Sequence, residues 1–316
     1  MALYRTYSDY LKEKYNEKVY KIPIALPVTC PNRDGTLDSD GCIFCGSIRA
    51  DYETKAVGME ITSQIDRSIS HVGPKYKAKK FIAYFLNFTN TYMPLSRFEY
   101  CVKEACGHPD IVGLAVSTRP DCIHESYLEV LREAQGKYGT NITVELGLQS
   151  VNPHTLLKIG RCHTVAEFID AALQIGRYHF DLCAHIIADL PWDDRIDVEE
   201  AAKLVSVLPV TEIKIHSLYI IKGTKLAKMY EKGDIKLLPP EEYAERVVLI
   251  LSMLRPDIVV QRIVGRASAN TLSVNGGRPW WEVKEYIEKL MRNRHIQQGS
   301  ACNYLHGSAV RRFLHE

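Results

Sequence analysis

Apolar, β-branched runs alternate with amphipathic segments along most of the chain. The runs have the composition of buried strands, and the segments between them repeat apolar residues at helical spacing. The strand-like runs are 19–26, 80–88, 110–118, 141–150, 180–190, 211–221 and 257–264, and the helix candidates lie at about 60–71, 95–106, 125–137, 164–178, 196–207, 240–254 and 280–293. This alternation predicts an α/β protein with βαβ units and a mainly parallel sheet. It favours a full or partial (β/α) barrel, with a doubly wound open sheet as the alternative.

Composition places the chain among ordinary globular proteins. It has 316 residues, of which 46% are apolar and 25% charged, and its net charge is +2. This charge argues against a polyanion-coating protein but leaves room for a local basic patch. The sequence has no run of 18 apolar residues, and its N-terminus lacks the apolar segment of a signal peptide. We therefore expect a cytoplasmic protein with no membrane partner.

Nine cysteines are many for such a chain, and they divide into two groups. The number is odd and the chain is not small, so a disulfide framework is disfavoured. Six cysteines are scattered among the periodic segments, and we interpret them as small buried apolar residues: Cys101, Cys106, Cys122, Cys162, Cys183 and Cys302. The other three, Cys30, Cys42 and Cys45, cluster in one polar loop after the first strand.

Three cysteines in the loop "TCPNRDGTLDSDGCIFC" (29–45) indicate a metal site with two competing identities. A zinc site needs four protein ligands, or three and a water molecule. An iron–sulfur cluster held by only three cysteines leaves one iron open. No histidine lies between residues 19 and 70 to complete a zinc site, and Phe44 supplies an apolar neighbour. These residues favour the cluster, while zinc and plain buried cysteines stay open.

The same loop resembles the cluster loop of the radical SAM superfamily, in a small bacterial group with C-x11-C-x2-C spacing. That group is similar to the radical SAM half of the elongator Elp3 proteins. Four further motifs match in order: "YFLNFTNTYMP" (84–94), "STRPDCI" (117–123), "VELGLQSVNPHTLLKIGRCHT" (144–164) and "IHSLYIIKGTKL" (215–226). The resemblance covers roughly residues 15–300.

The resemblance implies a fold and a chemistry. The fold is a partial (β/α)6 TIM-type barrel over 19–240, preceded by a helical segment over 1–18 and followed by a capping α/β extension over 241–316. The chemistry needs a [4Fe-4S] cluster on Cys30, Cys42 and Cys45, S-adenosylmethionine at the open iron, and an external electron donor such as flavodoxin or ferredoxin. Reductive cleavage then releases a 5′-deoxyadenosyl radical that abstracts hydrogen from a substrate.

The resemblance also implies residues that contact S-adenosylmethionine. Phe44 borders the cluster, Asn90 and Thr91 follow the second strand, and Arg119 ends the third. For Asn90 and Thr91 the alternative is a turn that caps a helix, and for Arg119 it is a salt bridge. The remaining residues in this set are Glu145, Gln149, Ser150, Arg161 and Asp189. Glu145, Gly147 and Gln149 alternate with apolar residues, so they share one face of their strand.

The substrate is predicted to meet His185, His216, Lys222 and Arg266. A lysine that snorkels to solvent is the alternative reading for Lys222. The sequence departs from the family pattern at three places. "DLPWDD" (189–194) replaces "GLPGE", and Arg266 stands where relatives usually carry an acid. Cys162 takes the place of a glycine and predicts a differently shaped loop.

A tRNA wobble-uridine side chain is the favoured substrate, because the nearest well-understood relatives modify this base. The basic run "KYKAKK" (75–80) and the pair Trp280–Trp281 beside Arg278 add a weak case for phosphate contacts and base stacking. A small metabolite or a peptide is the alternative substrate. A non-catalytic zinc scaffold is the last alternative.

Overall fold

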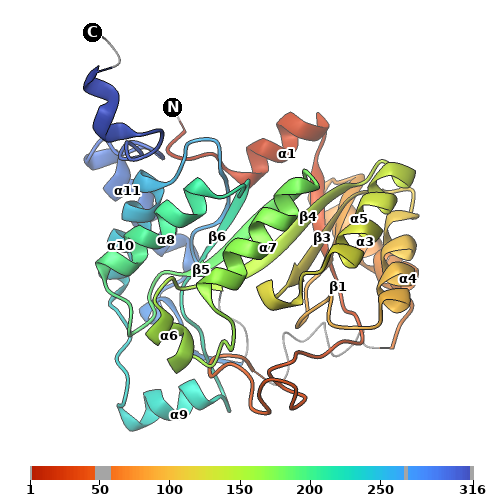
Figure 1. Cartoon of the computed structure of the whole chain (residues 1–316), viewed down its shortest axis with the longest axis horizontal. Coiled ribbons are helices and arrows are strands. Elements are labelled where there is room, and N and C mark those ends of the chain that lie inside the picture. The colour runs from red at the N-terminus through yellow and green to blue at the C-terminus, as the bar shows by residue number, and fades with distance from the viewer. Residues whose placement is uncertain (1, 47–57, 267–269, 314–316) are drawn as a thin grey trace.

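Seven parallel strands form one sheet whose spatial order follows the chain, and the sheet curves into a half-barrel (Figure 1). This computed structural model describes residues 2–46, 58–266 and 270–313. The order of neighbours is β1 (Val19–Ile24), β2 (Lys80–Phe85), β3 (Ile111–Thr118), β4 (Asn141–Gln149), β5 (Asp181–Ile187), β6 (Glu212–His216) and β8 (Val259–Arg262). A short antiparallel pair, β7 (Ile220–Ile221) and β9 (Thr271–Ser273), stands apart from it. The predicted parallel α/β half-barrel is confirmed.

Helices that connect consecutive strands cover the outer face of the half-barrel (Figure 1). They are α3 (Ile61–Tyr76), α4 (Leu95–Cys106), α5 (Glu125–Tyr138), α7 (Val165–Arg177), α8 (Arg195–Val207) and α10 (Pro240–Met253). The other described helices are α1 (Tyr7–Tyr15) before β1, α6 (Pro153–Lys158) after β4, α9 (Lys225–Lys232) after β7 and α11 (Trp280–Asn293) after β9. Side-chain caps fix several starts: Thr164 and Glu167 form a capping box at α7, and Asp194 and Asp197 form another at α8. Helices α6 and α9 were not predicted.

The strands present opposite faces to the helices and to the inside of the barrel. On β4, Ile142, Val144, Leu146 and Leu148 belong to the main hydrophobic core, so Glu145, Gly147 and Gln149 face the other way. The inner face is therefore where polar chemistry gathers.

The run 211–221 was expected as one strand and is instead divided into β6 and β7. The backbone N–H of Leu218 donates to the Asp189 carboxylate at 2.6 Å rather than to a neighbouring strand. The Ser217 hydroxyl also leaves the sheet and donates to Asn275 at 2.7 Å. These side-chain contacts end β6 early.

Both ends of the chain add to the sheet. Helix α10 and strand β8 lie beyond residue 240 and add a further unit to it. Near the N-terminus, Thr6 forms a parallel bridge with Val260, and α1 packs near β8 and β1, the two outer strands. Among the described residues, the helices are all too short or too polar to cross a bilayer.

Candidate active site

A large cavity of about 1030 Å³ lies inside the half-barrel, and all three loop cysteines line it. Lys21 in β1 and Cys30 beyond the end of that strand both border this cavity. The cavity therefore extends along the barrel from the cysteine loop towards α1, which contributes Tyr7 and Leu11. It is large enough for a cofactor and part of a substrate.

The cysteine loop is held by two side chains that sequence reasoning missed. The Arg33 guanidinium donates to the carbonyl oxygens of Cys45 (2.9 Å) and Gly46 (2.6 Å). Asn32 is fully buried, and its amide nitrogen donates to the carbonyl oxygens of Gly160 (2.8 Å) and Arg161 (3.1 Å). These contacts fasten the loop to itself and to the segment after β4.

The donor set at the cysteines fits an iron–sulfur cluster. Asn32 Nδ2 and Arg161 Nη1 each lie 3.6 Å from Cys42 Sγ, where an N–H donor and a cation stabilise thiolate charge. Three cysteine ligands leave one iron of such a cluster open for a further ligand.

Strand β4 ends in a conformation that brings Gln149 and Arg161 over Gly147. Gln149 has φ 69°, which is unusual for a residue with a side chain. A Cβ on Gly147 would lie 2.6 Å from Gln149 Nε2 and 2.9 Å from Arg161 Nη2, so a side chain at 147 would displace both from this arrangement. Both side chains line the cavity, and their predicted contact with S-adenosylmethionine stays a prediction. Cys162 has φ 56°, a left-handed conformation that favours glycine, and the predicted difference in loop shape stays a prediction.

In the turn after β2, Thr89 lines the cavity, whereas Asn90 and Thr91, the two residues predicted from the sequence, do not. The Asn90 amide donates to Phe85 and Ser117 carbonyl oxygens, and Thr91 Oγ1 bonds to Thr118 Oγ1 and to the Cys122 carbonyl. These side chains build the turn and do not line the cavity. Thr89 does line it, and its buried hydroxyl has no hydrogen-bond partner among the described residues.

Arg119 forms a salt bridge, and its predicted contact with S-adenosylmethionine stays a prediction. Its Nε and Nη2 donate to the two carboxylate oxygens of Asp121, at 2.9 and 2.8 Å. Its Nη1 is buried and has no hydrogen-bond partner in the described part of the chain, while the residue lines the cavity. The guanidinium is thus fixed by one carboxylate and keeps a donor for a second anion.

Further along the barrel, five strands contribute to a buried charged layer around Glu145. The layer is Lys21, Tyr84, Glu145, His185 and Lys214. Both lysines bond the Glu145 carboxylate, Lys214 at 2.5 Å, and Tyr84 and His185 bond its Oε2 at 2.6 and 2.9 Å. Glu145 is fully buried, and these partners occupy its carboxylate.

The charges of this layer can be assigned from its contacts. Burial opposes ionisation of Glu145, but the ammonium groups of Lys21 and Lys214 and the His185 hydrogen bond hold its pKa well below the usual range. Burial and Lys214 lower the pKa of His185 to about 4, so its ring is neutral at pH 7. Glu145, Cys183 and His185 have ligand atoms within 4.8 Å of one another. The two ammonium groups already fill the place of a cation there.

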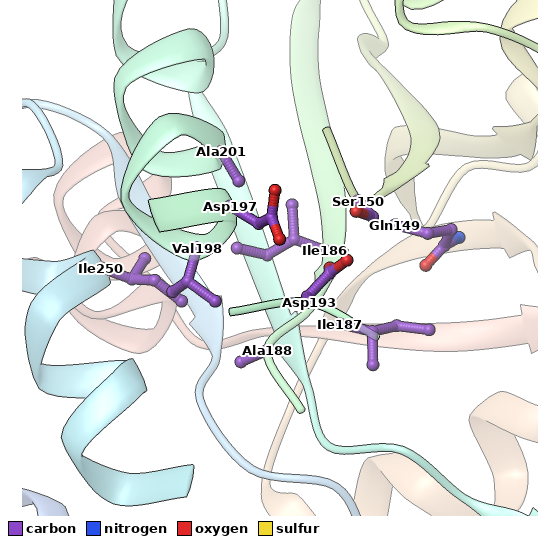
Figure 2. A pocket seen from close by; sticks show the side chains of 10 residues that line it. All are labelled: Gln149, Ser150, Ile186, Ile187, Ala188, Asp193, Asp197, Val198, Ala201 and Ile250. Atoms are coloured by element: carbon purple, nitrogen blue, oxygen red, sulfur yellow. The ribbon is translucent and has the colours of Figure 1, made fainter. Parts of the chain in front are cut away.

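Ser150 and Asp189 lie beside the large cavity rather than in it. Ser150 borders a small neighbouring cavity of about 10 Å³ with Asp193 and Asp197, and Figure 2 shows the Gln149 side chain directed away from these acids. Burial raises the pKa of Asp189 to about 7, and its carboxylate accepts the Leu218 N–H. Their predicted contact with S-adenosylmethionine stays a prediction, and their observed contacts are structural.

Three of the four predicted substrate residues line the large cavity. His185, His216 and Arg266 do so, and the buried His216 Nε2 has no hydrogen-bond partner among the described residues. Lys222 is exposed and does not border this cavity, because it follows β7 rather than lying on β6. Phe44 lines the cavity and also packs against a satellite hydrophobic cluster.

Comparisons with known proteins identify the family. Residues 210–293 match the Radical_SAM C-terminal domain. The Bacillus subtilis protein YtqA is 34% identical over 300 residues, which cover 94% of this chain and 92% of YtqA. The structure of Methanocaldococcus infernus Elp3 superposes with a TM-score of 0.61 at 17% identity, covering 89% of this chain and 64% of that chain. A Streptococcus suis SuiB structure bound to S-adenosylmethionine has a TM-score of 0.51 at 12% identity, covering 82% and 53% of the two chains.

The matches agree with the chemistry of the cavity, which is lined by three cysteines and by the guanidinium groups of Arg119 and Arg161. The cofactors of this family are a [4Fe-4S] cluster and S-adenosylmethionine. The chain belongs to the radical SAM superfamily, in the family of YtqA, and it is a radical SAM enzyme.

Proposed function

We propose that this enzyme modifies a tRNA wobble-uridine side chain. The observation that carries the proposal is the charge of the cavity lining. Nine described lining residues are lysine or arginine, and one, Glu17, is acidic; the cations are Lys12, Lys18, Lys21, Arg33, Arg119, Arg161, Lys214, Arg262 and Arg266. Such a lining attracts an anionic substrate, and RNA is a polyanion whose bases can enter pockets by leaving the stack.

One end of the cavity would bind the cofactors and the other end would bind the substrate. At the cysteine end, Cys30, Cys42 and Cys45 would hold the cluster, and Arg119 and Gln149 would bind the methionine part of S-adenosylmethionine. When bound, this pair of cofactors supplies a 5′-deoxyadenosyl radical. At the other end, His216 offers a buried ring nitrogen with no hydrogen-bond partner in the described residues, which suits a polar group of the base.

The charged layer would form one wall of the cavity at the end that binds the substrate. Lys21 and Lys214 bring two positive charges to the single carboxylate of Glu145, so the layer keeps a net positive charge when His185 is neutral. Tyr84 is anchored by Glu145 and presents its ring to the cavity. These residues orient the substrate and exclude water; none needs to change its protonation state.

Two measurements test the proposal separately. Anaerobically reconstituted enzyme with a strong reductant should release 5′-deoxyadenosine faster when tRNA is added. Nucleosides of tRNA from cells with and without the gene should differ at the wobble uridine. If cleavage responds to a small metabolite or a peptide and the tRNA nucleosides are identical, the tRNA substrate is wrong while the radical chemistry stands.

A further inference from the structure

The sheet is open along one line, between its outer strands β1 and β8, and the large cavity reaches this line. Tyr20 in β1, Arg262 in β8 and Arg266 just after β8 all line the cavity. We call this region, with its neighbours Lys75, Tyr76 and Trp280, the β1–β8 seam.

On the β1 side, the seam carries an aromatic stack with a cation beside it. The rings of Tyr20 and Tyr76 stack with centroids 4.5 Å apart and planes at 19°. The Lys75 ammonium lies 5.4 Å from the Tyr76 ring centre. Lys75 is exposed and Tyr76 is half-buried, so both are accessible to a ligand. The basic run 75–80 therefore begins beside the cavity.

On the β8 side, the seam carries arginine charge without an opposing acid. The Arg266 guanidinium lies 4.3 Å from the Trp280 ring centre, and the next residue, Trp281, is 56% exposed. Neither Arg262 nor Arg266 pairs with a carboxylate of the residues that the structure describes. By contrast, Arg278 close by is paired with Glu241 at 2.5 Å.

The two sides act on each other across the opening. The pKa of Tyr76 lies below its ordinary value because it bonds to Tyr20 and because the charges of Lys75 and Arg266 are near. Tyr20 from the β1 side and Arg266 from the β8 side line the same cavity. Aromatic faces and unopposed cations therefore border one cavity at the seam.

We propose that the β1–β8 seam binds single-stranded RNA and directs one nucleotide into the cavity, an inference that rests on the proposed tRNA substrate. Cations that track phosphates, interleaved with rings on which bases stack, are what single-stranded RNA requires. Phosphates would contact Lys75, Arg262 and Arg266, and a base would stack on the Tyr76 side. An acidic peptide would use the cations but gains little from the stacked rings.

The experiment measures binding of a fluorescent anticodon stem–loop RNA to the anaerobic holoenzyme by anisotropy, at several salt concentrations. Arg266→Glu and Lys75→Glu should each weaken binding about tenfold, and loss of one phosphate contact lowers the slope of log affinity against log salt by about 1. Tyr76→Ala should weaken binding about five- to hundredfold, and Tyr76→Trp should retain it. Urea unfolding of each variant checks that it folds.

Two matched controls belong to the chain itself. Lys137 lies 4.9 Å from the Tyr138 ring centre at the end of α5, a Lys–Tyr pair like Lys75–Tyr76 that does not border the cavity. Lys137→Glu should leave the affinity and its salt slope unchanged. Arg278→Gln should have a smaller effect than Arg266→Glu, because the charge of Arg278 is already paired.

The outcomes separate the inference from the proposed function. If wild-type enzyme binds RNA and the seam variants match Lys137→Glu, the seam is not the RNA surface, although the tRNA substrate stands. If Tyr76→Ala alone has no effect, the stacking part is wrong. If wild-type enzyme shows no salt-dependent affinity for any RNA, the tRNA substrate itself is wrong.

Discussion

The cysteine loop and the charged layer lie in the same cavity, but they are built in opposite ways. Cys30, Cys42 and Cys45 come from one stretch of sixteen residues, whereas each member of the charged layer comes from a different strand. The loop is therefore a local feature, and the spacing of its cysteines in the sequence is enough to indicate a metal site. The layer exists only once five strands are aligned. The comparison teaches that ligands for a cofactor can be visible in a sequence while the walls of the same cavity are not.

The two regions also differ in what removal of one residue should do. A loop cysteine would contribute a metal ligand at a partly open site, so its loss should affect chemistry before stability. Glu145 compensates two buried ammonium groups, so its loss leaves uncompensated charge in the interior. Variants in the two regions should therefore separate activity from folding.

The largest expected effect comes from the loop. Cys30→Ala, Cys42→Ala or Cys45→Ala should each abolish reductive cleavage of S-adenosylmethionine, because a cluster with two protein ligands is not retained. The measurement is 5′-deoxyadenosine released by anaerobically reconstituted protein. Cys302→Ala is the control and should cleave like the wild type. Retained cleavage in a loop variant would remove that cysteine from the ligand set.

In the charged layer, Glu145→Gln should destabilise the fold by about 3–5 kcal/mol, since it leaves two buried lysines without a carboxylate. Urea unfolding of the metal-free protein measures this change. A second change, Lys214→Met, should recover part of the loss. Glu99→Gln, which breaks an exposed pair with Lys103, is the control and should change stability little. A Glu145→Gln protein as stable as the wild type would contradict the charge assignment.

A smaller effect depends on pH and concerns Asp189, which belongs to neither region and accepts the Leu218 N–H. Burial raises its pKa from 3.8 to about 7, so the folded state binds more protons than the unfolded state between these values. The free energy of unfolding should therefore fall as pH rises, by about 2–3 kcal/mol from pH 5 to pH 8. Asp189→Asn should remove that part of the fall in denaturant titrations at the two pH values. An equal pH dependence in the variant would show that Asp189 is ionised throughout.

The sequence predicted the elements well because local signals mark them. Apolar runs placed all seven strands of the sheet, and apolar residues at helical spacing placed helices such as α7 and α8. It failed at 211–221, where Asp189 and Asn275 bond the residues that interrupt the strand. Both partners are distant in sequence, so no local pattern reports them.

For the site, alternation along β4 correctly placed Glu145 and Gln149 on the inner face, but it did not identify their partners. Lys21 and Lys214 each stand in an apolar run, and this was the available signal for a buried ion pair. Thr89 could not be distinguished from Asn90 and Thr91, because the direction of each side chain depends on the turn. Asn32 and Arg33 lie between the cysteines. No role was predicted for them from the sequence, because no known residue spacing marks side chains that hold such a loop in place.

The most direct test of the account is metal analysis of the anaerobically reconstituted wild-type protein, combined with electron paramagnetic resonance. The account predicts about four irons and four sulfides per chain, and a reduced-cluster signal that changes when S-adenosylmethionine is added. Protein without inorganic sulfide, or with zinc held by Cys30, Cys42 and Cys45, would contradict it.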